Sequence, residues 1–426
     1  MPSEPAEMTQ PQPYDFFVGT FNTPNLYTLR FTPPRASSPT SATKIKNSGF
    51  LKIVQKSSVV GSHSWLHLHP PRRHGVRNLY ATAWTEPPSV VAYAVDSPTS
   101  IRLLNTAPTR SRSGYVAASD VALYSAGGAT GEVYSLDPET GAIVSPTSAT
   151  NGNSASKPIK PLQDLSFVDT SASQRDNGTV MDFGGLRHGA HSADLSPDGQ
   201  ALYVADIGRN CIWTYTVSPS DGSLTLGEKH ISPRANDGPR HVWPHPSGRF
   251  VYCLQEHTSM VDVFSTHGGG RLQFDQGVRI IPAEECEGEF WADEVRTSLS
   301  NGDAPKYLYA STRGLEHGKK GYVAVYQLTA DGRIDTSQQR NGAGGTSSYE
   351  TDERYAGLLD MYTTATSGGW ANAVQPGPTV DGIEYLALTD SEEGLVFVLA
   401  WDGKKLTEAA RVTLGEGEGA ATAVWL

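Results

Sequence analysis

The sequence lacks the features that mark membrane proteins and nucleic-acid-binding proteins. It contains no run of about 18 apolar residues, which a membrane-spanning helix would need. Basic tracts are absent, and 45 acidic residues against 34 basic ones give a formal net charge of −11. Nucleic acid and anionic membranes are therefore poor partners. An anionic ligand would need a few local Arg or Lys side chains to attract it against the overall field.

Cysteine is scarce as well. The three cysteines, Cys211, Cys253 and Cys286, show no Cys-x-x-Cys spacing, which argues against a disulfide framework and against a zinc site. Because Cys211 and Cys253 stand in apolar strand contexts, we expect both to be buried as small apolar side chains. The sequence also has no Gly-rich phosphate loop, no Gly-x-Ser-x-Gly nucleophile motif and no cluster of metal ligands.

Long stretches with helical periodicity are absent too. The chain has 426 residues, 38% of them apolar, with 43 Gly and 28 Pro, a turn-rich composition that favours β-structure. Its N-terminus, MPSEPAEMTQPQP, is polar and lacks the apolar core of a signal peptide. We therefore predict a flexible N-terminal segment over residues 1–13, one folded unit over residues 14–426, and a cytoplasmic location.

What the chain does contain is an internal repeat. HSADLSPDGQALYVADIGRNCIWTYTV (191–217) and RHVWPHPSGRFVYCLQEHTSMVDVF (240–264) both read as a short strand, a Pro-x-Gly turn, an apolar strand, a polar turn and an alternating strand. Their Pro, Gly and Tyr residues align at one offset of 49 residues. A period of about 40–50 residues with several strands per unit is typical of a β-propeller.

Fainter copies of the unit raise the count to about seven. They are found at 16–31, 65–95, 115–136, 307–328 and 384–401. We therefore predict an all-β fold, a single seven-bladed β-propeller, in which the lone last strand (420–426) pairs with N-terminal strands to close the ring. The Gly/Ser-rich stretches near 140–180 and 336–353 are predicted to be loop insertions.

The repeat also predicts where side chains meet. In a propeller blade the first strand lines the channel and the second runs back, so the start of the first and the end of the second lie at the same channel mouth. At the offset of 49, His191 aligns with Arg240 at the start of first strands. At an offset of 57, Glu256 aligns with Arg313 at the end of second strands. These four side chains are predicted to converge at one mouth.

Such a set suits an anionic substrate. Arginine binds carboxylates with two parallel hydrogen bonds, and His or Glu can transfer a proton. The structural alternatives are that His191 bonds to the turn of its own blade and that Glu256 and Arg313 form an ion pair. His241 and His245 fit a structural role better. Trp370 and Asn372, at the start of the last inner strand, are predicted as a wall of the pocket.

The residues around these positions resemble a known family. The similarity is carried by HSADLSPDGQALYVADI, GPRHVWPHPSGRFVYCLQE, LYASTRG, SGGWANAVQPGP and EYLALTDSEEGLVFVLAWDGKKLTEAARV. It covers most of residues 190–426 and, more loosely, the first 140. The chain resembles the lactonase-type seven-bladed propellers, and among them the carboxy-cis,cis-muconate cyclases, also called 3-carboxy-cis,cis-muconate lactonizing enzymes.

The resemblance implies a reaction and roles for residues. The family's active-site His falls on His191, its two arginines on Arg240 and Arg313, and its Glu on Glu256. It implies a cofactor-independent intramolecular lyase of aromatic catabolism (the β-ketoadipate pathway), which closes 3-carboxy-cis,cis-muconate to a γ-lactone. The catalytic pair would be His191 and Glu256, with Arg240 and Arg313 binding substrate. Family members can be homo-oligomers.

One departure leaves the substrate open. The cyclases typically have His after the Ser-Gly-Gly of the last inner strand, where this chain has Trp370. Two alternatives therefore stand beside the cyclase: a lactone hydrolase of the 6-phosphogluconolactonase kind on the same fold, and a non-catalytic propeller that binds a protein.

Overall fold

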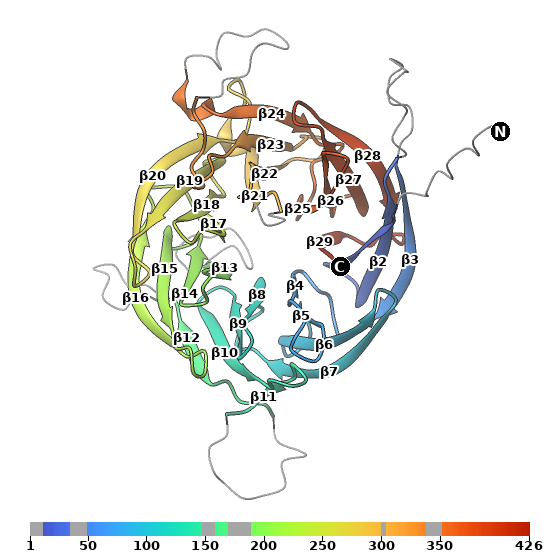
Figure 1. The fold of residues 1–426 in the computed structure, drawn as a ribbon, viewed down its shortest axis with the longest axis vertical. Coiled ribbons are helices and arrows are strands. Elements are labelled where there is room, and N and C mark those ends of the chain that lie inside the picture. Colours follow the sequence, from blue (N-terminus) through green and yellow to red (C-terminus); the bar gives the residue numbers. More distant parts are fainter. Residues whose placement is uncertain (1–11, 35–48, 147–157, 169–188, 300–303, 338–351) are drawn as a thin grey trace, which may run out of the picture.

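The described part of the chain forms seven antiparallel sheets arranged around a central axis (Figure 1). The structure is a computed structural model, which describes residues 12–34, 49–146, 158–168, 189–299, 304–337 and 352–426. We number the sheets as blades 1 to 7 in chain order. This arrangement confirms the predicted seven-bladed propeller. Among the described residues, no helix is long and apolar enough to cross a membrane.

Blades 1 to 3 have the following strands, from the innermost outward. Blade 1 contains β29 (Ala420–Trp425), β1 (Tyr14–Thr20), β2 (Asn25–Thr32) and β3 (Phe50–Ser58); blade 2 contains β4 (Leu66–Leu68), β5 (Asn78–Ala83), β6 (Ser89–Ser97) and β7 (Ser100–Pro108); blade 3 contains β8 (Tyr115–Ala118), β9 (Ala122–Ala126) and β10 (Thr130–Leu136), with β11 (Ile143–Val144) and β12 (Gln163–Ser166) both paired to β10.

Blades 4 to 7 are regular four-stranded sheets. Blade 4 contains β13 (Ala190–Leu195), β14 (Ala201–Asp206), β15 (Cys211–Val217) and β16 (Leu224–Ile231); blade 5 contains β17 (Pro239–Pro244), β18 (Phe250–Gln255), β19 (Met260–Thr266) and β20 (Leu272–Arg279); blade 6 contains β21 (Phe290–Thr297), β22 (Tyr307–Gly314), β23 (Tyr322–Gln327) and β24 (Leu358–Thr363); blade 7 contains β25 (Val374–Val380), β26 (Ile383–Asp390), β27 (Leu395–Trp401) and β28 (Leu406–Thr413). The short 3₁₀ helices η2 (Glu287–Glu289) and η3 (Glu353–Tyr355) lie in connections.

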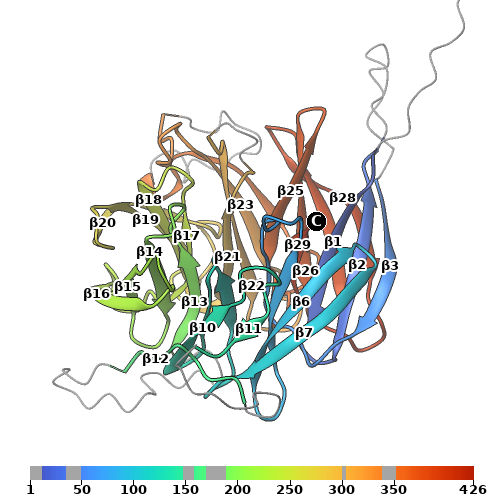
Figure 2. The ribbon, with the colours of Figure 1, turned by 60° about the horizontal axis from the view of Figure 1, so that its bottom comes forward.

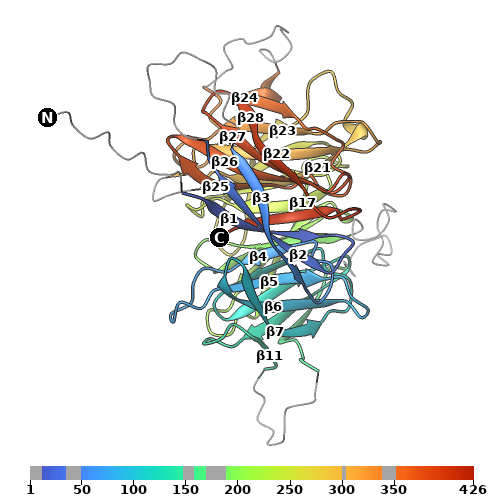
Figure 3. The same ribbon diagram turned by 90° about the vertical axis from the view of Figure 1, so that its right-hand side faces the viewer.

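The ring closes as predicted, with the C-terminal strand β29 as the innermost strand of blade 1. It pairs with β1 in an antiparallel register that sets Phe16 opposite Trp425, and these two rings pack 4.4 Å apart. Figures 2 and 3 show the blades standing side by side around the axis, with the first strand, β1, and the last strand, β29, next to each other in blade 1. Because blade 1 takes strands from both ends, no sheet edge is left open at the junction.

The repeated Tyr of each second strand explains part of the repeat. Tyr80, Tyr124 and Tyr252 are buried, and each hydroxyl donates a hydrogen bond to a glycine carbonyl in a turn of the following blade. Each of these rings buries a large apolar area between two sheets, and its polar tip finds a partner. The repeat therefore records contacts between blades as well as strands within them.

Other sequence expectations have mixed outcomes. Cys211 and Cys253 are buried and free, as predicted. The stretch 140–180 is not only a loop, because β11 and β12 within it complete blade 3. The predicted N-terminal segment, 1–13, and most of 336–353 lie outside the described residues.

Candidate functional site

A cavity of about 710 Å³ opens at one end of the channel, where all seven inner strands begin. This volume is in the range of pockets that bind small molecules. Residues at or just before the start of every inner strand line it: Ser64, Trp65, Gly114, His191, Arg240, His241, Asp293, Ala371, Ala373, Ala421 and Thr422. Other connections add Phe21, Trp84, Ser111, Arg112, Gly127, Gly128 and Trp370, and β22 adds Arg313.

A β-bulge in each of three successive inner strands aims a polar side chain at this cavity. His191, Arg240 and Asp293 are the residues skipped in the pairing of β13, β17 and β21 with their neighbours. A bulged residue leaves the alternation of the strand, so its side chain can point where a regular residue could not. The three residues therefore occupy one equivalent position in blades 4, 5 and 6.

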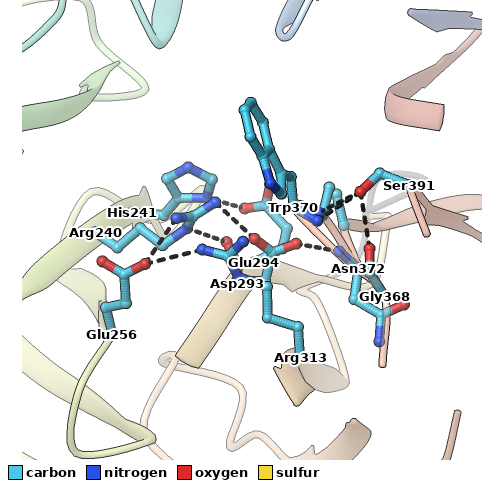
Figure 4. Close-up of polar contacts among 12 residues, drawn as sticks. Arg240, His241, Glu256, Asp293, Glu294, Arg313, Gly368, Trp370, Asn372 and Ser391 are labelled. Atoms are coloured by element: carbon cyan, nitrogen blue, oxygen red, sulfur yellow. Dashed lines mark hydrogen bonds and ion pairs between the residues drawn. The ribbon is translucent and has the colours of Figure 1, made fainter. Parts of the chain in front are cut away.

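Two arginines share one buried carboxylate behind the cavity wall (Figure 4). Glu256 Oε1 accepts hydrogen bonds from Arg240 Nη1 at 3.0 Å and from Arg313 Nη2 at 3.2 Å. Glu256 is fully buried, whereas both arginines line the cavity. Glu256 thus holds the two guanidiniums side by side without facing the cavity itself.

Asp293 and backbone carbonyls complete the arginine cluster. Arg240 Nη2 donates to Asp293 Oδ1 at 2.6 Å, and Arg313 Nη1 donates to the Gly369 carbonyl at 3.1 Å. Within the described residues, Arg313 Nε has no partner. Asn372 donates its backbone N–H to Asp293 Oδ2. These contacts fix the orientation of both guanidinium groups. The Nε–H of Arg313 remains available to donate a hydrogen bond.

Burial and neighbouring charges shift the pKa values of the two arginines in opposite directions. For Arg240, burial lowers the pKa, but the carboxylates of Asp293 and Glu256 outweigh it and raise the pKa overall. For Arg313, burial and the positive charge of Arg240 together lower the pKa. Because arginine side chains stay protonated at neutral pH in proteins, the site presents two charged guanidiniums.

Two histidines stand beside the arginines. The rings of His191 and His241 are 5.0 Å apart, and both residues line the cavity. His241 Nδ1 lies 2.9 Å from Glu294 Oε1, and its Nε2 has no hydrogen-bond partner in the described part of the chain. Burial lowers the pKa of His241 despite the carboxylate of Glu294, so the ring is neutral at neutral pH.

A chain of polar groups continues from Glu294 deeper into the channel. Arg296 lies 3.3 Å from Glu294 and donates to the Tyr115 hydroxyl, which donates in turn to Asp194 Oδ1 at 2.9 Å. Burial raises the pKa of Asp194 to about 7, although Arg296 and Tyr115 act in the other direction. Asp194 can therefore hold a proton in neutral solution.

The mouth of the cavity has an aromatic wall formed by Phe21, Trp84 and Trp370. Phe21 lies 5.7 Å from Trp84 and 5.9 Å from Trp370, measured between ring centres. Trp370 is 59% exposed, which is unusual for a Trp, and it follows directly on the Gly369 that binds Arg313. The guanidinium carbon of Arg112 lies 5.2 Å from the centre of the Trp84 ring.

The family follows from a match over most of the chain. Residues 16–347 match the family described as Lactonase, 7-bladed beta-propeller. The chain belongs to this lactonase family.

Named relatives narrow the comparison within the lactonase family. Muconate cycloisomerase 1 of Cutaneotrichosporon cutaneum is 38% identical over 425 residues, which covers 98% of this chain and 99% of that protein. Carboxy-cis,cis-muconate cyclase of Neurospora crassa is 28% identical over 248 residues, 56% of this chain and 60% of that protein. The solved periplasmic gluconolactonase of Pseudomonas aeruginosa shares the fold, with a TM-score of 0.65 at 15% identity over 97% of this chain and 99% of that one.

The structure of this lactonase-family chain brings the four predicted residues together. His191, Arg240 and Arg313 line the cavity, and Glu256 lies behind the arginines. Of the two predicted wall residues, Trp370 lines the mouth. Asn372 is fully buried instead, where its side-chain amide donates to the Thr312 carbonyl.

Sequence reasoning missed three cavity residues. Asp293 occupies the bulge position of His191 and Arg240, but its offset from Arg240 is 53 residues instead of 49, so the repeat did not reveal it. Arg112 lies in the connection before β8, outside the strands that the repeat alignment compared. His241 was given a structural role, although its place next to Arg240 was a usable signal. Among the described residues, no group of three or more His, Cys, Asp or Glu is placed to hold a metal ion.

Proposed function

We propose that this protein is a cycloisomerase, an intramolecular lyase that closes 3-carboxy-cis,cis-muconate or a close analogue to a γ-lactone. The observation that carries the proposal is the Arg240–Glu256–Arg313 cluster facing a small-molecule cavity beside His191. The near full-length similarity to a protein named muconate cycloisomerase 1 supports the same activity. Such a reaction belongs to the breakdown of aromatic compounds.

The arginines bind and orient the substrate. Arg240 and Arg313 hold carboxylates of the diene, which offsets the repulsion between these groups and places one carboxylate oxygen against the conjugated double bond. That oxygen forms the new C–O bond, and the π electrons move toward the carbon beside the far carboxylate.

Proton delivery to that carbon completes the reaction. We assign it to His191 because, of the two predicted catalytic residues, His191 lines the cavity and Glu256 does not. Imidazole titrates near neutral pH, which suits a general acid. Glu256 acts by positioning Arg240 and Arg313.

An absorbance assay tests the function. Purified protein should deplete the ultraviolet absorbance of 3-carboxy-cis,cis-muconate or of cis,cis-muconate, and His191→Ala should lower kcat by about 100-fold or more. His74→Ala serves as the matched control, because His74 is a surface residue paired with Glu139. Unchanged absorbance with hydrolysis of sugar lactones would instead identify a lactone hydrolase. Failure of every such substrate, together with capture of a stable protein partner, would identify a binding module.

A cytoplasmic location and assembly into a homo-oligomer stay predictions. Cell fractionation tests the first, and light scattering on the purified protein tests the second.

A further inference from the structure

The charged groups around the inner cavity cancel one another. Three buried arginines are matched by three buried carboxylates with which they form ion pairs; these six residues are Arg240, Arg296, Arg313, Glu256, Asp293 and Glu294. Their formal charges sum to zero, in a chain whose net charge is −11. The arginine pair offers directed hydrogen bonds, but it supplies little net attraction for a substrate with several negative charges.

Arg112 is the exception among the cavity-lining arginines. It is exposed, it lines the mouth, and within the described residues it forms no ion pair. Its guanidinium rests near the Trp84 ring, a contact that orients an arginine while leaving its donors available. Arg112 precedes β8, which lies across the channel from the β21 and β22 strands of blade 6 (Figure 1).

The cavity lining combines charged and aromatic side chains, which suits a partly apolar anion. Arg240 and Arg313 line it from blades 5 and 6, and Arg112 lines it from the connection before β8, beside the aromatic wall of Phe21, Trp84 and Trp370. Aromatic faces suit a planar, conjugated carbon chain, which packs on them without burying an unpaired polar group.

We propose that Arg112 is a second anion-binding position, which binds the substrate carboxylate farthest from Arg240 and Arg313. The substrate class that follows is an unsaturated di- or tricarboxylate long enough to reach both positions, with its carbon chain against the aromatic wall. This inference rests on the proposed cycloisomerase function and specifies how its site recognises the substrate.

Steady-state kinetics of Arg112→Gln test the proposal. We expect the KM for cis,cis-muconate to rise about tenfold, because a charge-assisted hydrogen bond to one substrate carboxylate is lost. The monomethyl ester of muconate, with one carboxylate fewer, should show a much smaller change. Arg112→Lys should recover part of the loss, since it retains the charge without the planar contact to Trp84.

Arg73→Gln is the matched control. Arg73 is exposed and lies in the β4–β5 connection, at the opposite end of the channel from the residues that precede β4 in the cavity. Arg73→Gln removes the same unit of charge as Arg112→Gln. A change in KM that both variants share therefore reflects the long-range electrostatic field of the protein. Equal KM values for Arg112→Gln and Arg73→Gln on every substrate would overturn the proposal.

Calorimetric binding of adipate separates this inference from the proposed function. Adipate has two carboxylates and cannot cyclise, so it reports on recognition alone. We expect its affinity to fall about tenfold in Arg112→Gln and to be unchanged in Arg73→Gln. Equal affinities in both variants, or no binding to the wild type, would overturn the inference. A wild type that binds adipate but converts no muconate would overturn the proposed function and leave Arg112 as an anion-binding residue.

Discussion

Glu256 shows how one buried side chain can organise a site that it does not enter. A single oxygen of its carboxylate accepts hydrogen bonds from two arginines whose positive charges repel each other. Without this shared acceptor, Arg240 and Arg313 would lie close together in a buried region with one negative partner fewer. The position of both guanidiniums therefore depends on a residue outside the cavity lining.

Glu256→Gln tests this positioning role. The amide keeps the shape but removes the charge, so we expect the free energy of unfolding to fall by about 3 kcal/mol, the usual cost of breaking a buried ion pair. Denaturant titration measures it. The KM should rise while the pH profile of kcat keeps its shape, since the proton would come from His191. A profile that loses one limb would show that Glu256 itself transfers the proton.

Asp194 gives the fold a pH dependence of its own. Because burial raises its pKa to about 7, the folded chain keeps a proton that the unfolded chain releases near pH 4. The stability that this proton provides is complete below about pH 4 and is lost as the pH rises toward 7. Relative to Asp194→Asn, the wild type should therefore lose up to about 4 kcal/mol across this range.

Thermal unfolding of both proteins between pH 2 and 8 measures the difference. Asp198→Asn is a control of opposite sign, because a hydrogen bond from the Ser196 hydroxyl lowers the pKa of Asp198. Its contribution should be lost as the pH falls. Parallel stability curves for wild type and Asp194→Asn would contradict the prediction.

At the scale of single residues, the repeat predicted site residues only where they keep the spacing of the repeat. His191, Arg240, Glu256 and Arg313 could be found because equivalent positions in neighbouring blades hold side chains that a structural role does not require. Whether such a side chain faces the cavity or lies behind it depends on bulges and packing, which one sequence does not reveal. That is why Glu256 and Asn372 could not be told apart from lining residues.

At the scale of elements, the bulges in β13, β17 and β21 matter most. Each sits one to three residues after the start of its strand and directs His191, Arg240 or Asp293 into the cavity. The start of β13 is held by backbone hydrogen bonds between Ala190 and Gly128 of blade 3. A shift of this junction would move His191 together with its strand.

Gly189→Ala should produce that shift. A Cβ at this position would lie 2.2 Å from the Gly128 carbonyl oxygen, which belongs to the backbone and cannot rotate away. We expect a lower Tm and a decrease in kcat/KM of about tenfold or more, because small misplacements of catalytic groups are costly. Gly288→Ala is the control, since its nearest neighbour would be Cys286 Sγ at 4.0 Å. Equal kcat/KM values in the two variants would contradict this account.

Strands in which apolar and polar residues alternate could be predicted from the sequence. Strands that form only because they pair with a neighbouring strand could not. All seven units read from the sequence became blades, because their apolar strands fill the spaces between sheets. β11 and β12 were missed, since the short polar segment Gln163–Ser166 has no alternation and becomes a strand only by pairing with β10. Segments of this kind are defined by their neighbours and not by their own residues.

For the whole molecule, closure of the ring through β29 is the critical contact. Deletion of residues 420–426 would expose β1 along its inner edge and remove Ala421 and Thr422 from the cavity. We expect this truncated chain to lose its cooperative thermal transition and to aggregate, because an unpaired inner strand leaves an open sheet edge. Calorimetry and size-exclusion chromatography measure both effects.

A chain that ends at Trp425 is the control, because it keeps all of β29 and loses only Leu426 and its hydrogen bond to the Asp15 carbonyl. It should unfold as the wild type does. A truncation at 419 that still unfolds cooperatively and remains monodisperse would show that the other six blades suffice for the fold.

The same closure has a consequence for biosynthesis. Since β29 follows all the other strands in the sequence and supplies both an inner strand and part of the cavity wall, a nascent chain cannot form the complete binding site until residues 420–426 have left the ribosome. Blades 2 to 7 can form in order during synthesis, but the ring stays open until β29 emerges from the ribosome. A premature stop before residue 420 would therefore yield a protein without the complete site, and activity would report that β29 had been translated.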